Sequence, residues 1–288
     1  MERPTIHTVS FASEGPPHDE GLPLGWDMLN SWGAMCIAGG STTFTGHTVR
    51  SLSNKSDGDA WCVQSYPEEH FMSSNPGYHK TGLGAWRAVI LRKAMDTAKD
   101  GDIVVVHCVN FKKYPNMCYF AENLRPYAEA VVKFTDLYSP PHEWNAYATG
   151  AEVLALISDP EVRRIVAFAP AGLCRLIIAR VNSKTRAFAK TFEETIKSDP
   201  ILLSPKNKTV FPGSAWHHEA AEQAVFNVLA YREGLFPLNW QTSWMSYMKD
   251  IAREHGCGVD KILRLSADSV IPQIQNKCKK EDPSTQDC

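Results

Sequence analysis

The feature that most constrains the fold is a helical pattern that leads through a short polar turn into a continuous apolar run. From Gly84 onward, apolar residues recur at the spacing of one helix face. Residues 99–102 then form a turn, and residues 103–106 read Ile-Val-Val-Val. Such a run is typical of a strand buried on both faces, as in a parallel sheet covered by helices. The sequence therefore predicts the α/β class, with a mostly parallel, Rossmann-like central sheet flanked by helices.

Other segments extend this pattern into one domain over residues 1–270, followed by a polar tail over residues 271–288. The predicted strands are residues 5–11, 165–168 and 176–180, with residues 49–52 as the edge of a further strand. The predicted helices are residues 26–32, 151–158, 183–196 and 216–231, with another inside residues 116–133 and with Ser183 as an N-cap. Residues 134–150, which include two adjacent prolines, are predicted to form an exposed loop.

Charge and composition exclude several classes of protein. The 288 residues include 30 Lys and Arg against 32 Asp and Glu, and this balance argues against a nucleic-acid-binding protein. No apolar run approaches the ~20 residues that span a bilayer, and the first residues lack a secretory apolar region. We therefore expect a soluble protein, either cytoplasmic or the soluble part of a longer or secretory-pathway protein. The eight cysteines show no C-x-x-C spacing, which argues against a zinc ribbon.

The residues that follow the apolar run are the first candidates for a site, because ligands of open α/β sheets bind beyond the carboxyl ends of strands. His107, Cys108 and Asn110 stand there. The Asn110 carbonyl can bind Mg²⁺ or Mn²⁺, whereas the Cys108 thiol is a poor ligand for either. The alternative is a packed strand end. Lys113 and Tyr114 follow as a cation and an aromatic at the mouth of a site, or as a solvated turn.

A second polar cluster lies at the start of the predicted helix over residues 216–231. His217, His218, Glu219, Glu222 and Gln223 crowd into seven positions. In a helix His218 and Glu222 share one face, but no second histidine completes a zinc-protease pattern. The helix can carry Glu219 or Glu222 into a cleft as a base or a hydrogen-bond acceptor. The alternative is a surface helix start with acids near its positive end.

Two shorter segments complete the candidates. Residues 13–15, Ser-Glu-Gly, suit a loop around a nucleotide base or ribose, or an ordinary loop. Arg87 can place a cation near a phosphate, while the neighbouring Trp86 is also a candidate core residue. Neither a nucleophile elbow nor a P-loop motif is present, so the sequence supports neither a serine hydrolase nor a P-loop kinase.

The order of these segments resembles that of GT-A-type nucleotide-sugar glycosyltransferases. Those enzymes begin with a strand and a Ser/Glu/Gly loop, similar to residues 5–15 here. Their helix start G-x-G-x-W-(K/R) is similar to residues 82–87, and their G-D-I strand with H-D-x-N-x-x-K-Y-P is similar to residues 101–115. A strand ending in Arg, an R-x-F helix and an acid-Gln pair are matched by residues 176–180, 186–188 and 219–226. The resemblance covers roughly residues 5–235.

The resemblance implies transfer of a sugar from a nucleoside diphosphate sugar to a hydroxyl of a glycan or glycoconjugate acceptor. It implies donor binding by Ser13, Glu14, Gly15, Trp86, Arg87, His107, Cys108 and Asn110. It places Lys113, Tyr114, His217, His218 and Gln223 at the acceptor or in the cleft. Glu222, and after it Glu219, is the expected carboxylate near the acceptor. An inverting enzyme would use it as a base, whereas a retaining enzyme need not, and the sequence leaves both open. Glu222→Ala is then expected to abolish transfer and to leave the fold intact.

One residue departs from the family pattern, because Cys108 stands where the metal-binding acid is expected. The enzyme then works without a metal through cations such as Arg87 and Lys113, or another acid joins Asn110 in holding Mn²⁺ or Mg²⁺. A third possibility is a catalytically silent relative that binds a nucleotide sugar or glycan. A nucleotidyltransferase and a plain scaffold protein are the remaining alternatives.

Overall fold

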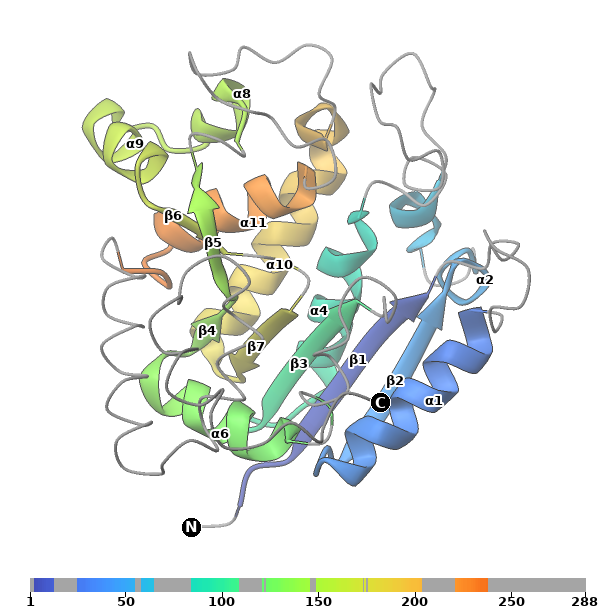
Figure 1. The fold of residues 1–288 in the computed structure, drawn as a ribbon. Helices are drawn as coiled ribbons and strands as arrows, with labels where there is room; N and C mark the ends of the chain where they lie inside the picture. The colour runs from blue at the N-terminus through green and yellow to red at the C-terminus, as the bar shows by residue number, and fades with distance from the viewer. Residues whose placement is uncertain are drawn as a thin grey trace, which may run out of the picture.

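A five-stranded sheet forms the middle layer of the protein, and helices cover both of its faces (Figure 1). The computed structural model describes residues 3–12, 25–54, 58–64, 84–108, 121, 123–145, 149–172, 174, 176–203 and 221–237. The predicted α/β class is confirmed. Among the helices that these residues form, none is long and apolar enough to cross a membrane.

The sheet has the strand order β2-β1-β3-β7-β4. Its strands are β1 (Ile6–Ala12), β2 (Thr43–Thr48), β3 (Ile103–Cys108), β4 (Leu137–Tyr138) and β7 (Leu176–Arg180). β1 pairs in parallel with β2 and β3, whereas β7 pairs antiparallel with β3 and β4. Four strands therefore run in one direction and β7 runs against them. The carboxyl ends of β1, β2 and β3 meet at one edge, which we call the carboxyl edge.

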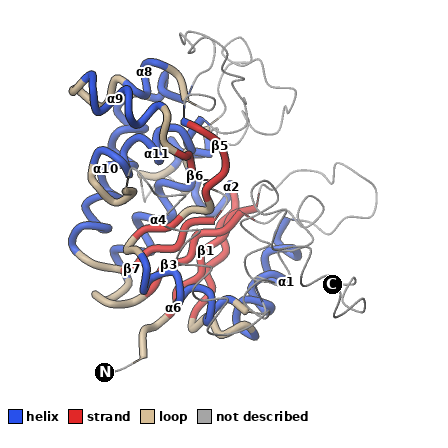
Figure 2. Tube along the Cα trace, turned by 60° about the vertical axis from the view of Figure 1, so that its left-hand side comes forward, coloured by secondary structure: helices blue, strands red, loops and turns tan. Residues whose placement is uncertain are grey.

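Alternation along β3 divides the core between the two faces of the sheet. Ile103 and Val105 pack with α1 (Gly25–Ala38) and α6 (Leu124–Phe134). Val104 and Val106 pack on the opposite face with α4 (Trp86–Thr97), α10 (Ser183–Ser198) and α11 (Ala221–Arg232). The side chains of the four apolar residues, 103–106, are all buried, as the apolar run predicts. Figure 2 shows the two helical layers on either side of the strands.

A small second sheet of β5 (Pro141–Trp144) and β6 (Pro170–Gly172) adjoins α11. Two side chains four residues apart on α11, Asn227 and Tyr231, make hydrogen bonds to the backbone of β6. Asn227 accepts from Gly172 N at 2.7 Å and donates to Gly172 O at 2.9 Å. Tyr231 donates to Pro170 O at 2.6 Å. One face of α11 thus fixes the position of β6 through side-chain hydrogen bonds.

Replacing Asn227 with Ala is expected to lower the free energy of unfolding by about 2–3 kcal/mol. The change leaves the buried N–H and C=O of Gly172 without the Asn227 amide, and each lost partner costs about 1–3 kcal/mol. Tyr231→Phe removes one hydrogen bond and is expected to cost about 1 kcal/mol. Urea unfolding of the two variants measures the difference. Equal losses would contradict the assigned bidentate role of Asn227.

Two predicted strands are wrong, and in both places a capping side chain starts a helix. Residues 49–52 form helix α2 (Val49–Leu52), because Thr48 and Ser51 make reciprocal capping hydrogen bonds. Residues 165–168 lie largely in α9 (Pro160–Ala167), where Asp159 accepts from two backbone N–H groups at 2.8 and 3.1 Å. Local capping therefore outweighs the β-branched composition of both segments.

The prediction of an exposed loop over residues 134–150 is also wrong. β4 and β5 lie within it, and Tyr138, Ser139 and Asn145 are buried. β5 begins with Pro141, at the position where a strand tolerates proline. Another correction concerns the cap of α10, which is Asn182 and not Ser183.

The other predicted elements agree with the structure where it describes them. α1 extends the helix predicted at residues 26–32 to fourteen residues, and α8 (Ala151–Leu154) is shorter than predicted. Two 3₁₀ helices, η2 (Ala60–Val63) and η5 (Pro200–Leu203), complete the described elements. The start of the predicted helix at residues 216–220 and the tail at residues 271–288 lie outside the described residues.

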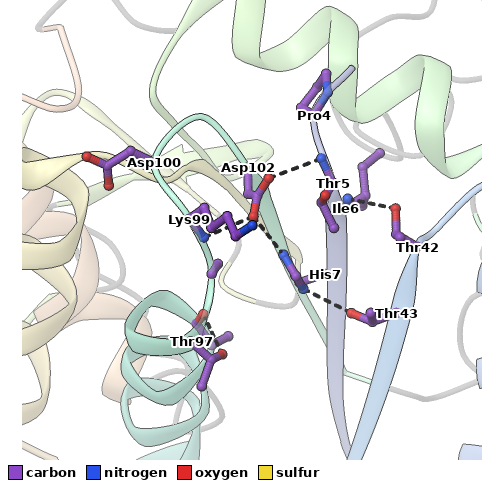
Figure 3. A network of polar contacts seen from close by, with 12 residues as sticks. Pro4, Thr5, Ile6, His7, Thr42, Thr43, Thr97, Lys99, Asp100 and Asp102 are labelled. Atoms are coloured by element: carbon purple, nitrogen blue, oxygen red, sulfur yellow. Dashed lines mark hydrogen bonds and ion pairs between the residues drawn. The ribbon is translucent and has the colours of Figure 1, made fainter. Parts of the chain in front are cut away.

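A polar network joins the strands at the edge opposite the carboxyl edge (Figure 3). Asp102 accepts from Thr5 N at 3.1 Å, from Lys99 N at 2.9 Å and from His7 Nε2 at 3.1 Å. His7 Nδ1 lies 3.0 Å from Thr43 Oγ1. Burial alone would raise the pKa of Asp102, but the hydrogen bonds from His7 and the backbone bring it below its ordinary value. Asp102 is therefore a structural residue, which links β1 and β3 directly and β2 through His7.

Candidate functional site

The carboxyl edge is the place where a ligand of this sheet is expected. β1, β2 and β3 end there, and β7 begins there, with Leu176 opposite His107. Ligands of open α/β sheets bind outside such an edge, where successive connections leave in different directions. The first turn of α4 lies beside this edge, because Trp86 stacks on Phe11 near the end of β1, and the first turn of α11 meets it there through the contact of Glu222 with Arg87.

A buried ion pair joins the first turns of α4 and α11. Arg87 Nη1 donates to Glu222 Oε1 across a sequence separation of 135 residues. The side chains are only 6% and 3% exposed. The structure therefore unites two site residues that the sequence nominated from separate motifs. Each offsets part of the cost of burying the charge of the other.

Gly84 lies directly against this ion pair. Its φ of +83° falls in the left-handed region, which favours glycine. A Cβ added to it would lie 2.4 Å from Glu222 Cδ and 2.7 Å from Arg87 Nη1. Both the backbone conformation and the close approach therefore require a residue without a side chain.

Replacing Gly84 with Ala is expected to cost about 2–3 kcal/mol of unfolding free energy. Gly101→Ala is the matched control, because Gly101 also has a positive φ, +91°, but no atom lies within 4 Å of its added Cβ. The control reports the backbone strain of a positive φ alone, about 1 kcal/mol. The excess at Gly84 reports displacement of the ion pair. Chemical denaturation compares the two, and equal losses would show that the pair moves aside freely.

An aromatic stack supports the guanidinium of Arg87. The rings of Phe11 and Trp86 stack with centroids 4.3 Å apart and planes at 18°. Arg87 Cζ lies 4.3 Å from the centroid of the Trp86 ring, within the range of a cation–π interaction. Trp86 is 3% exposed, so it is a core residue and a platform for Arg87 at once. Its side chain orients the cation.

Gln223 binds protein backbone in this structure. Its Oε1 accepts from Cys174 N at 3.1 Å, and the side chain is buried. Cys174 is a buried free thiol whose pKa is raised well above its ordinary value. Burial is the main cause, the charge of Glu222 adds to it, and the charge of Arg87 opposes it. Gln223 therefore fixes the backbone that carries Cys174 beside the ion pair.

His107 lies on the other face of the sheet from the ion pair. Its ring packs against Trp32 of α1, with centroids 4.6 Å apart. Its backbone carbonyl accepts from Ser10 Oγ at 2.6 Å. Burial, with a smaller effect of the Arg87 charge, lowers the pKa of His107 to about 3. His107 is therefore uncharged at neutral pH and offers no positive charge to a phosphate.

Several predicted site residues lie outside the described residues. These are Ser13, Glu14, Gly15, Asn110, Lys113, Tyr114, His217, His218 and Glu219. The backbone of Cys108 ends β3, and its side chain is not described.

The described residues do not fit a divalent cation. They contain no group of three His, Cys, Asp or Glu side chains that could hold a metal ion. Glu222, an acid beside the carboxyl edge, already pairs with the guanidinium of Arg87, and this guanidinium would repel a metal ion.

Comparison of the chain with models of protein families, with curated proteins and with solved structures finds no match.

Three residues of the site were not recognised from the sequence. The sequence predicts Phe11 only as part of a strand. Cys174 carries no local signal, because only the packing of β6 against α11 brings it near Glu222. Gly84 had a signal, since a glycine just before an Ala-Trp-Arg helix start often marks a positive φ or a close approach.

Proposed function

We propose that this protein is a glycosyltransferase that moves a sugar from a nucleoside diphosphate sugar to a hydroxyl of a glycan or glycoconjugate. The observation that carries the proposal is the Arg87–Glu222 pair beside the carboxyl edge of the parallel strands. Sugar transfer from such a donor needs an anion site for the leaving diphosphate and a carboxylate near the acceptor hydroxyl. The pair supplies one group of each kind. We propose further that the domain has the GT-A fold.

In this proposal Arg87 stabilises the diphosphate and Glu222 serves the acceptor. The bond between the anomeric carbon and the diphosphate oxygen breaks, and the leaving group carries away the electron pair. The acceptor oxygen bonds to the anomeric carbon, and its proton passes to the Glu222 carboxylate. The cation–π contact with Trp86 holds the guanidinium in place, so little reorganisation accompanies charge development on the leaving group. Arg87 supplies positive charge without a metal, which suits a chain with Cys108 in place of the expected acid.

Thermal unfolding with a panel of nucleoside diphosphates, with and without Mn²⁺, tests the donor site. A ligand that binds only the folded state must raise the midpoint of unfolding. We expect one nucleoside diphosphate to do so in the absence of Mn²⁺. The matching nucleotide sugars, incubated with candidate glycan acceptors, are then expected to release that diphosphate in step with acceptor glycosylation. Donor binding without turnover would favour a silent relative, and no response to any nucleotide would contradict the proposal.

A further inference from the structure

The start of α4 combines three features that favour an anion. Ala85 supplies no side-chain cap to the helix, and only its backbone carbonyl accepts, from Ala88 N at 3.1 Å. Gly84 has no side chain, which lets a ligand approach the backbone closely. Arg87 adds a guanidinium in the first turn. Helix N-termini attract anions through their N–H groups and dipole, and the guanidinium strengthens that attraction.

In the structure the carboxylate of Glu222 lies at the start of α4, against Gly84 and Arg87. Its Oε1 accepts from Arg87 Nη1, and its Oε2 would lie 2.5 Å from a Cβ added to Gly84. The carboxylate thus lies against both the guanidinium and the glycine turn, the two groups that favour an anion. It comes from α11, an element far along the chain, and is not part of the turn itself.

We propose that Glu222 acts as an exchangeable internal anion, which the diphosphate of the donor displaces from Arg87. The inference rests on the proposed function, because it names what the donor does at that site. A diphosphate carries at least two negative charges against the single charge of a carboxylate. Its oxygens also match the fork of donors on a guanidinium. The diphosphate is therefore expected to bind the Arg87 guanidinium more strongly than the Glu222 carboxylate does.

Exchange gives a reason for an acid inside a site for an anion. In the free protein Glu222 offsets part of the cost of burying the Arg87 charge. When the donor takes over the guanidinium, the released carboxylate is available to accept a hydrogen bond from the acceptor hydroxyl. The base is thus freed only after the donor has bound, and the donor precedes the acceptor in the order of events.

Calorimetric titration of wild type and Glu222→Gln with UDP, GDP, ADP and CDP tests the exchange. Because Gln removes the competing charge, we expect the variant to bind the preferred diphosphate at least about tenfold more tightly. Glu193→Gln is the matched control, since Glu193 also pairs with an arginine, Arg92, at 2.6 Å, but away from the glycine turn. That variant is expected to bind like wild type. If folded Glu222→Gln binds equally or less tightly, exchange is overturned and the donor site stands. If neither wild type nor Glu222→Gln binds any of the four, both proposals fail.

Anion rescue of Glu222→Ala gives a second test that does not depend on a nucleotide. Formate or inorganic pyrophosphate can enter the space of the deleted carboxylate. We expect either to raise the unfolding midpoint of Glu222→Ala more than that of wild type at equal concentration. Glu193→Ala is expected to respond like wild type. Equal responses from all three proteins would show that Glu222 does not occupy an anion site and would overturn the exchange.

Discussion

Glu222→Ala is expected to lower the free energy of unfolding by about 3–5 kcal/mol, because it removes the carboxylate that pairs with the buried guanidinium of Arg87. Sequence reasoning treats Glu222 as a cleft residue whose loss spares the fold. The structure changes that expectation, since both side chains of the pair are almost fully buried. Arg87→Met is expected to cost a similar amount, because it removes the guanidinium that pairs with the buried Glu222 carboxylate. Equilibrium urea unfolding at neutral pH measures both losses.

The double variant Arg87→Met/Glu222→Met separates the pair from its surroundings. With both charges removed, apolar side chains of similar length fill the space, and replacing a whole buried pair is often close to neutral. The double variant is therefore expected to be more stable than either single variant. The non-additivity gives the coupling energy of the pair. The exposed pair Arg164–Glu161 is the control, and Glu161→Ala is expected to leave stability unchanged within error. Additive losses at Arg87 and Glu222 would contradict a direct ion pair.

This result also determines how activity measurements are interpreted. Loss of transfer in Glu222→Ala has two possible causes, a missing base or an unfolded protein. A protein with a stability of about 5–15 kcal/mol can lose most of it in this one substitution. Glu222→Gln keeps a hydrogen-bonding side chain beside Arg87 and is the better test of the base. Transfer by folded Glu222→Gln at the wild-type rate would exclude Glu222 from proton transfer.

The central part of the fold could be predicted because its signals are local. Four consecutive apolar residues after a polar turn specify a doubly buried strand, and β3 has that structure. Capping interactions are also local but depend on side-chain geometry, so Asp159 and Thr48 start helices where composition favours strands. The two adjacent prolines favour a loop over residues 134–150. Pro141 nevertheless occupies the first position of β5, where no ladder N–H is needed.

The candidate site could be predicted only as separate pieces. Motif order nominated Arg87 and Glu222 independently, but their contact depends on α4 and α11 packing on the same face of the sheet. His107 lies on the opposite face of the sheet from Arg87 and Glu222, because side chains along β3 alternate between the two faces. A continuous apolar run gives no sign of which face each side chain takes. Cys174 enters the site through hydrogen bonds between α11 and the backbone beside β6. Such contacts between distant segments leave no pattern in one sequence.

The environment of His107 predicts a loss of stability in acid. Its pKa in the folded protein is about 3, below the ordinary value of 6.5, mainly because burial disfavours the charged ring and also because Arg87 is nearby. Above pH 6.5 the ring is neutral in both states, so its titration costs nothing. Between pH 6.5 and 3 the unfolded chain binds a proton that the folded protein does not. The free energy of unfolding therefore decreases as the pH is lowered through that window, by about 1.4 kcal/mol per pH unit.

Over the whole window this single ring is expected to remove about 5 kcal/mol of stability, comparable with the loss of the ion pair. His107→Phe keeps an aromatic ring against Trp32 and removes the titration. Urea unfolding from pH 8 to pH 4 is expected to show a shallower acid slope for the variant, and a constant difference from wild type above pH 7.5. Carboxylates shared by both proteins cancel in this comparison. Parallel curves down to pH 4 would mean that His107 takes up its proton in the folded protein near its ordinary pKa, which a ring enclosed between β3 and α1 should resist.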